Sequence, residues 1–153
     1  MGTDWPRQPE RDGSSSGHVR PTEGPRSVDL LVAMDEAGLA EVREFTRRTL
    51  ADWALDHRSD DAVTVVTELT ANALVHAAAD ETNVWLRLSR RAAHVVCAVT
   101  DHSDQPPVYP HAPDPLAEHG RGLRIIEALS EHWGWTRRTP GGKTVWAMLP
   151  ARP

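Results

Sequence analysis

The chain has 153 residues, of which 39% are hydrophobic and 25% charged, so its length and composition are those of one soluble globular domain. Its net charge is −5 and Lys143 is its only lysine, which argues against nucleic acid as a partner, because such a partner needs a basic surface. No stretch approaches the roughly 18 apolar residues of a membrane span, and the polar N-terminus has no apolar leader, so we expect a cytoplasmic protein that makes no membrane contact.

The first 27 residues differ in composition from the rest of the chain. They include four prolines and four glycines and almost no apolar residues. Such a segment buries too little apolar surface to offset the entropy lost when it becomes ordered. We therefore predict a disordered tail over residues 1–27 and a single domain over residues 28–153.

The first half of this domain is predicted to form one strand and two helices. The apolar run 29–34 predicts a strand, and Asp35 is placed to cap the helix that follows. In that helix apolar residues recur every three or four positions, which gives one buried stripe. Either Asp60 or Asp61 is then placed to cap a second helix over 62–78.

The second half is predicted to contain two hairpins and one helix. Residues 82–89 alternate between apolar and polar, and residues 93–100 are almost continuously apolar, which predicts a hairpin of two strands. A segment over 102–119 contains five prolines, and loops of this length usually serve a function. A helix over 122–133 and strands over 135–139 and 144–149 follow. This order predicts an α+β fold, a two-layer sandwich with helices on one face of a mixed, mostly antiparallel sheet.

Three polar side chains form a line along the second predicted helix. Glu68, Asn72 and His76 are spaced four residues apart, so at 3.6 residues per turn they lie on one side. In such a row a carboxylate can accept a proton from a hydroxyl, an amide oxygen can bind Mg²⁺ and an imidazole can hold a phosphate. The alternative is an ordinary solvated helix face.

Three further segments contain residues suited to ligand binding. Asp101 and Ser103 follow an apolar strand, where a carboxylate either accepts a hydrogen bond from an exocyclic amine or starts a turn. Residues 120–123 open the third predicted helix, and their two glycines allow a phosphate to approach the helix N-terminus, although a plain turn has the same pattern. Residues 141–144 fit a hairpin turn, and their lysine and threonine can add a charge and a hydroxyl to a nucleotide site.

Together these four segments resemble one known family in their order and spacing. They are E-L-x-x-N-A-x-x-H-A from Glu68, D-x-S from Asp101, G-R-G-L from Gly120 and G-G-x-T-V from Gly141. This order resembles the GHKL superfamily of histidine kinase-like ATPases over about residues 28–150. Within it, the chain looks most like the short, stand-alone anti-sigma-factor serine kinases of the actinobacterial type.

The resemblance implies a Bergerat-type sandwich that binds ATP and Mg²⁺ between its helices and a lid over 102–119. It implies that Asn72 holds Mg²⁺, that Glu68 is the catalytic carboxylate that activates the nucleophile, and that Asp101 contacts the adenine amine. The other nucleotide-binding residues that it implies are His76, Ser103, Gly120, Arg121, Gly122, Leu123 and Thr144. Ser103 departs from the family pattern, because many members have glycine at this position.

Two functions follow from this resemblance. In the first, the chain is a protein serine/threonine kinase that acts as an anti-sigma factor or phosphorylates a small anti-sigma antagonist protein, and it forms a homodimer as related kinases often do. In the second, it is a non-catalytic switch that binds a protein partner in an ATP-dependent way. A metal site built from His102, His111 and His119 is disfavoured, because no histidine pair has zinc-ligand spacing or a thiolate beside it.

Overall fold

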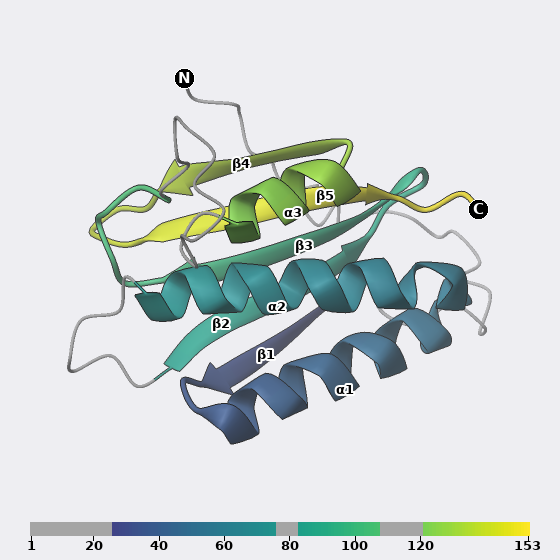
Figure 1. The fold of residues 1–153 in the computed structure, drawn as a ribbon, viewed down its shortest axis with the longest axis horizontal. Coiled ribbons are helices and arrows are strands. Elements are labelled where there is room, and N and C mark those ends of the chain that lie inside the picture. The colour runs from purple at the N-terminus through teal and green to yellow at the C-terminus, as the bar shows by residue number, and fades with distance from the viewer. Residues whose placement is uncertain (1–25, 76–82, 108–120) are drawn as a thin grey trace, which may run out of the picture.

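The computed structural model describes residues 26–75, 83–107 and 121–153, and the tail predicted over 1–27 lies almost wholly outside them (Figure 1). The elements in chain order are β1 (Ser27–Ala33), α1 (Glu36–Asp52), the short 3-10 helix η1 (Asp56–Arg58), α2 (Ser59–Val75), β2 (Asn83–Arg90), β3 (His94–Asp101), α3 (Arg121–Leu129), β4 (His132–Arg137) and β5 (Lys143–Pro150). Within the described residues, no helix is both long enough and apolar enough to cross a membrane.

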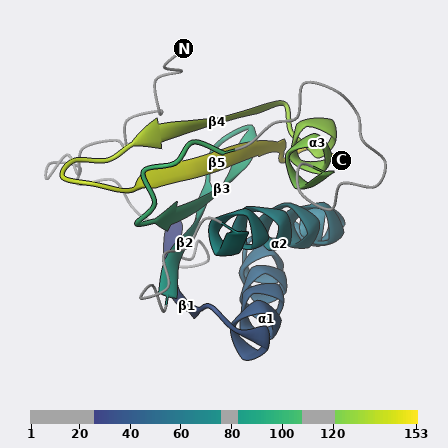
Figure 2. The ribbon, with the colours of Figure 1, turned by 60° about the vertical axis from the view of Figure 1, so that its left-hand side comes forward.

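The five strands form one sheet in the order β1-β2-β3-β5-β4, and every neighbouring pair is antiparallel. All three α-helices lie on the same face of this sheet (Figures 1 and 2). The predicted two-layer α+β sandwich is therefore confirmed. The sheet is antiparallel throughout the described residues instead of mixed, because α1 and α2 together carry the chain out and back between β1 and β2.

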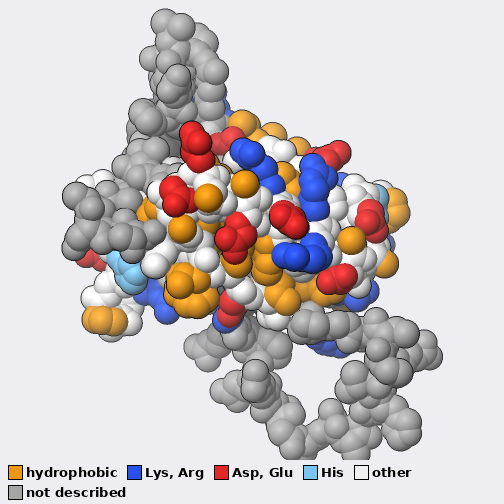
Figure 3. Space-filling view, turned by 90° about the horizontal axis from the view of Figure 1, so that it is seen from below, with side chains coloured by type: hydrophobic (Ala, Val, Ile, Leu, Met, Phe, Trp, Pro, Cys, Tyr) orange, Lys and Arg blue, Asp and Glu red, His pale blue; other side chains and the backbone are white. Residues whose placement is uncertain are grey.

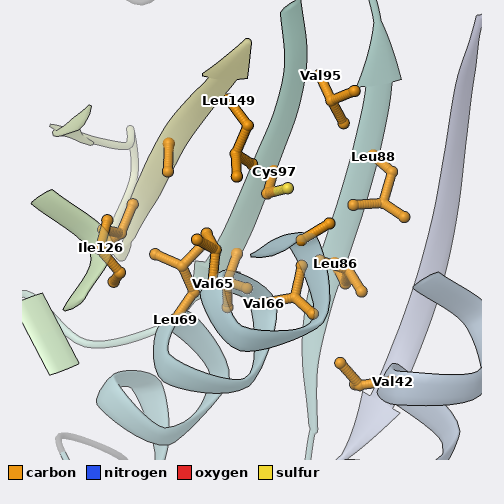
Figure 4. Packing of buried hydrophobic residues seen from close by; sticks show 14 of the residues in the cluster. Val42, Val65, Val66, Leu69, Leu86, Leu88, Val95, Cys97, Ile126 and Leu149 are labelled. Atoms are coloured by element: carbon orange, nitrogen blue, oxygen red, sulfur yellow. The ribbon is translucent and has the colours of Figure 1, made fainter. Parts of the chain in front are cut away.

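The core lies between α2 and the middle of the sheet. Val65, Val66 and Leu69 of α2 point toward Leu86 of β2 and Cys97 of β3 (Figure 4). All five side chains are at most 1% exposed, so α2 is held to the sheet by the burial of apolar surface. Burial also raises the pKa of the Cys97 thiol to about 12, which makes it a core side chain and not a reactive thiol.

Helix boundaries show where sequence patterns are informative and where they mislead. Asp35 caps α1 as predicted, and its side chain accepts a hydrogen bond from Gly38 N at 2.7 Å. The predicted cap of α2 is wrong, because this helix begins at Ser59 and both candidate aspartates lie in its first turn. The prediction that the third helix extends to Trp133 is also wrong. The helix ends at Leu129, since the nearby Glu131 N already donates to Met148 O of β5 at 2.9 Å.

Gly38 allows α1 to start close to the end of β1. A Cβ at this position would lie 1.7 Å from the Ala33 carbonyl oxygen, which already accepts a hydrogen bond from Asp35 N. Gly38→Ala is therefore expected to lower the free energy of unfolding by about 1–3 kcal/mol, measured by urea denaturation. Gly141→Ala is the control, because its Cβ would lie 3.7 Å from the nearest side-chain atom. Equal losses in the two variants would contradict this steric explanation.

Candidate functional site

Three of the segments singled out in the sequence lie at one end of the sandwich. At the left of Figure 1, α2 ends, β3 ends at Asp101 and α3 begins at Arg121. The start of β5 reaches the same end, because its first residue, Lys143, pairs with Asp101 in the sheet register. Helix α2 contacts both α3 and β3, so the predicted polar line on α2 faces a corner formed by several elements.

Glu68 lies directly against the first turn of α3. Its Oε2 atom would be 2.7 Å from a Cβ at Gly122, so the absence of a side chain at Gly122 makes room for the carboxylate. Glu68 is partly buried, and this burial raises the pKa of its carboxyl. A carboxylate with a raised pKa is a stronger proton acceptor than one on an open surface.

Asn72 lies one helical turn beyond Glu68 on α2. Asn72 as a whole is partly exposed, but its Oδ1 atom is buried and accepts no hydrogen bond from any described residue. A buried carbonyl oxygen without a partner costs roughly 1–3 kcal/mol, so such atoms usually mark a place for a water, an ion or a ligand. Glu68 and Asn72 therefore place two oxygen atoms that can act as ligands on one line of α2, as the sequence predicts.

Asp101 forms a buried ion pair with Lys143, and both side chains are 1% exposed. Lys143 Nζ lies 3.0 Å from Asp101 Oδ2 and donates to Oδ1 at 3.1 Å. Oδ1 also accepts from Ser103 N at 2.8 Å, and Oδ2 has the Lys143 ammonium group as its charged partner. Lys143 is thus paired with Asp101 inside the protein, whereas the sequence alone suggests a charge that a nucleotide site could use.

Two turns are joined beside this ion pair. Gly142 has φ +91°, and a Cβ there would lie 2.3 Å from the Asp101 carbonyl oxygen, so the β4–β5 turn packs tightly against the end of β3. Asp104 Oδ1 accepts from Gly142 N at 3.0 Å. The Ser103 hydroxyl accepts from Gln105 N at 3.2 Å, which holds the chain after β3 in a compact turn.

Thr144 faces the side of the sheet away from the helices. Its hydroxyl lies 2.8 Å from the Thr100 hydroxyl, and both residues line a cavity of about 490 Å³ on the helix-free face, together with Trp85. Neighbouring residues of a strand point to opposite faces, so Lys143 and not Thr144 shares the face of Val145 and the core. The structure therefore places Lys143 beside Asp101, and it places Thr144 on the opposite face of the sheet, away from the other predicted site residues. The alternation of β5 was the signal in the sequence that pointed to Lys143.

The remaining predicted residues divide between the core and segments that the structure does not describe. Leu123 is 1% exposed and packs in the core beneath α3. His76 and Gly120 lie outside the described residues, as do the side chain of Arg121 and most of the predicted lid. Among the residues that the structure describes, no group of three or more His, Cys, Asp or Glu side chains is placed to hold a metal ion.

The raised pKa of Glu68 predicts a pH-dependent effect on stability. The ordinary pKa of a glutamate carboxyl is 4.5, so above this pH the unfolded chain releases the proton more readily than the folded chain does, and ionised Glu68 destabilises the fold. Glu68→Gln is therefore expected to unfold at a higher urea concentration than the wild type at pH 7.5, and the gap is expected to close below about pH 4. Glu44→Gln on the exposed side of α1 is the control. A gap of equal size at both pH values would contradict the assignment.

Comparison with known proteins connects this geometry to a family. A family model for the histidine kinase-like ATPase domain matches residues 32–149, which include every element from the end of β1 to β5. A comparison with curated proteins gives no match. The match covers more than half of the chain and spans the Glu68, Asn72 and Asp101 corner, and it implies ATP as the ligand. The chain belongs to the histidine kinase-like ATPase domain family.

Proposed function

We propose that this chain is an ATP-binding regulatory protein that works as a protein serine/threonine kinase. One observation carries the proposal. Helix α2 presents two oxygen groups one turn apart: the partly buried carboxylate of Glu68, which touches the start of α3 at Gly122, and the amide oxygen of Asn72, which accepts no hydrogen bond from the described residues. Such an arrangement combines a proton acceptor and a hard oxygen ligand beside a helix N-terminus, which favours phosphate.

The residues at this corner fit ATP and Mg²⁺. Asn72 Oδ1 is an oxygen of the kind that Mg²⁺ prefers, and the described chain gives it no other partner. Asp101 is the residue that the resemblance assigns to the exocyclic amine of adenine, and in this structure its carboxylate is buried against Lys143. The backbone N–H groups at the start of α3 suit the phosphates. We therefore assign the Mg²⁺ ion to Asn72, the adenine ring to Asp101 and the phosphates to the segment that begins α3.

The catalytic role that we assign to Glu68 follows from its surroundings. When bound, ATP supplies the phosphoryl group and Mg²⁺ neutralises part of its charge. Glu68 orients the hydroxyl of a substrate serine and accepts its proton, and partial burial makes the carboxylate a better base. Gly122 keeps α3 close enough for this carboxylate to lie beside the phosphate segment.

The protein partners that we propose are a sigma factor, a small anti-sigma antagonist protein, or both in competition, with a homodimer as the assembly. This part rests on the resemblance to short stand-alone anti-sigma kinases. The alternative function, an ATP-dependent binding switch without phosphotransfer, uses the same residues for nucleotide binding. It differs only in what Glu68 does, so a substitution at Glu68 separates the two.

The first test is of nucleotide binding. The chain is titrated with ATP, once with Mg²⁺ and once with EDTA, and tryptophan fluorescence and calorimetry measure the binding. We expect the wild type to bind in the millimolar range or tighter, and Asn72→Ala to lose about tenfold or more of the Mg²⁺-dependent affinity. Asn83→Ala, at the start of β2, is the matched control. Absence of ATP and ADP binding in the wild type would refute the proposal, and an unchanged affinity in Asn72→Ala would refute the metal assignment.

A further inference from the structure

A second cavity, of about 420 Å³, lies at the opposite end of the sandwich from Asp101. It is lined by residues from four places in the chain: the residue before β1, Leu55 between α1 and η1, the end of β2 with the turn after it, and the residues that follow β5. In Figure 1 this end is at the right, beside the C-terminus. Strand β3 runs the whole way between the two ends, and its eight residues span about 25 Å, so this cavity is separate from the proposed nucleotide site.

Four arginines, Arg26, Arg90, Arg91 and Arg152, line this cavity. The other lining residues are apolar, and no aspartate or glutamate is among them. Within the described part of the chain, none of the four guanidinium groups forms an ion pair with a carboxylate. Four arginine residues therefore line one hollow, and none of the described lining residues has an acidic side chain.

Arg91 shows that this hollow contains an unsatisfied donor. Its Nε atom is buried and donates no hydrogen bond to any described residue. Arg87, by contrast, donates to both carboxylate oxygens of Asp29, at 2.7 and 3.0 Å. A buried charged donor without a partner is costly, so the missing acceptor at Arg91 points to a ligand with oxygen acceptors.

The backbone that presents the arginines is held by hydrogen bonds between three segments. Arg90 N donates to Arg26 O at 2.7 Å, and Arg91 N donates to His94 O at 2.8 Å. Arg58 donates to the Arg152 carbonyl oxygen through both Nε and Nη2. The cavity is therefore built on main-chain positions that hydrogen bonds hold in place before any ligand binds.

The charge gathered here contrasts with the rest of the molecule. The chain carries a net charge of −5, and in the face shown in Figure 3 acidic and basic side chains are interspersed. A local excess of positive charge in an acidic protein attracts anions to that part of its surface. Guanidinium groups are planar forks that bind carboxylate or phosphate oxygens in pairs, and lysine does not share this geometry.

We infer that this arginine cavity binds a compact oxyanion with two or more negative charges, and that a diphosphate group is the chemistry that fits it best. A diphosphate offers several acceptor oxygens in a small volume, which suits a cavity lined by four arginine residues. The concave shape favours a small ligand over a flat acidic surface of another protein. This site goes beyond the proposed kinase function and does not depend on it.

The test is calorimetric titration of the full chain with inorganic pyrophosphate, without Mg²⁺, at physiological salt. We expect one site per chain, and we expect Arg91→Gln and Arg90→Gln each to weaken binding about tenfold to a hundredfold, the loss that follows from removing a charged hydrogen-bond donor. Arg43→Gln, on the exposed side of α1, removes the same charge and is expected to bind like the wild type. In the wild type, the Arg91 Nε–H NMR signal is also expected to shift on titration.

Three outcomes would overturn the inference. The first is binding that Arg91→Gln and Arg90→Gln leave unchanged, which would place pyrophosphate elsewhere, for instance at the nucleotide site. The second is an equal weakening in Arg43→Gln, which would indicate non-specific attraction. The third is binding of a polyglutamate peptide with the same arginine dependence but no binding of pyrophosphate, which would assign the cavity to an acidic protein segment. ATP affinity is expected to be the same in Arg91→Gln and the wild type.

Discussion

Replacing Lys143 with Met is expected to lower the free energy of unfolding by about 3–5 kcal/mol. The substitution keeps a long side chain but removes the only lysine, which leaves Asp101 as a buried carboxylate with its ion-pair partner gone. The cost is large because the charge is 1% exposed and water cannot replace the ammonium group. Urea denaturation followed by circular dichroism measures the loss.

A double variant separates the ion pair from the packing around it. Asp101→Asn combined with Lys143→Met removes both charges, and we expect it to recover most of the loss, since a neutral buried pair has no unpaired charge. Arg47→Met provides the control on an exposed ion pair, because its partner Asp60 has a side chain that is 90% exposed, and we expect a change of about 1 kcal/mol or less. If the double variant were no more stable than Lys143→Met, the buried charge would not be the cause.

Glu68→Ala is expected to lower the rate of phosphotransfer to a serine of the partner protein by about 10²–10⁴-fold, the usual contribution of a general base. The affinity for Mg²⁺ and ATP is expected to change only a few fold, because we assign those ligands to Asn72, Asp101 and the start of α3. The assay follows transfer of the labelled γ-phosphoryl group to candidate antagonist proteins. Glu44→Ala, on the exposed side of α1, is the matched control.

The same experiment decides between the two proposed functions. If Glu68→Ala abolishes phosphotransfer while ATP still binds, the chain is a kinase. If the wild type transfers no phosphoryl group and Glu68→Ala still binds its protein partner in an ATP-dependent way, the chain is a binding switch. Glu68→Gln, which has nearly the same volume, tests whether any loss comes from the carboxylate or from the space that it fills.

Periodicity was enough to predict most of the fold. The alternation in β2 and the apolar stripes on the helices are set by local geometry, so these elements appear where they are predicted. Trp133 misled the prediction because its spacing from Leu129 continues a helical pattern, while tertiary pairing with Ala147 places it in β4. Whether neighbouring strands run parallel or antiparallel likewise depends on tertiary structure. For β1 and β2 it depends on the path of the chain through α1 and α2, which no single segment of sequence encodes.

The site was predictable where it depends on one helix and less so where it depends on strand register. Glu68 and Asn72 share a line because of the helical repeat alone. Lys143 and Thr144 are neighbours, and a shift of one residue decides which of them meets Asp101. The arginine cavity was not predicted, because its members come from four separate places in the chain and only the fold brings them together.

The strand order also brings together residues that are far apart in the sequence. Asp29 of β1 meets Arg87 of β2 across 58 residues, and Asp101 of β3 meets Lys143 of β5 across 42 residues. Such distant pairs close large loops, and the entropy of closure is lost before the contacts are gained. The hairpins β2–β3 and β4–β5 are local by comparison. On a ribosome, β1 therefore emerges first but has no strand to pair with until both long helices and β2 have been synthesised.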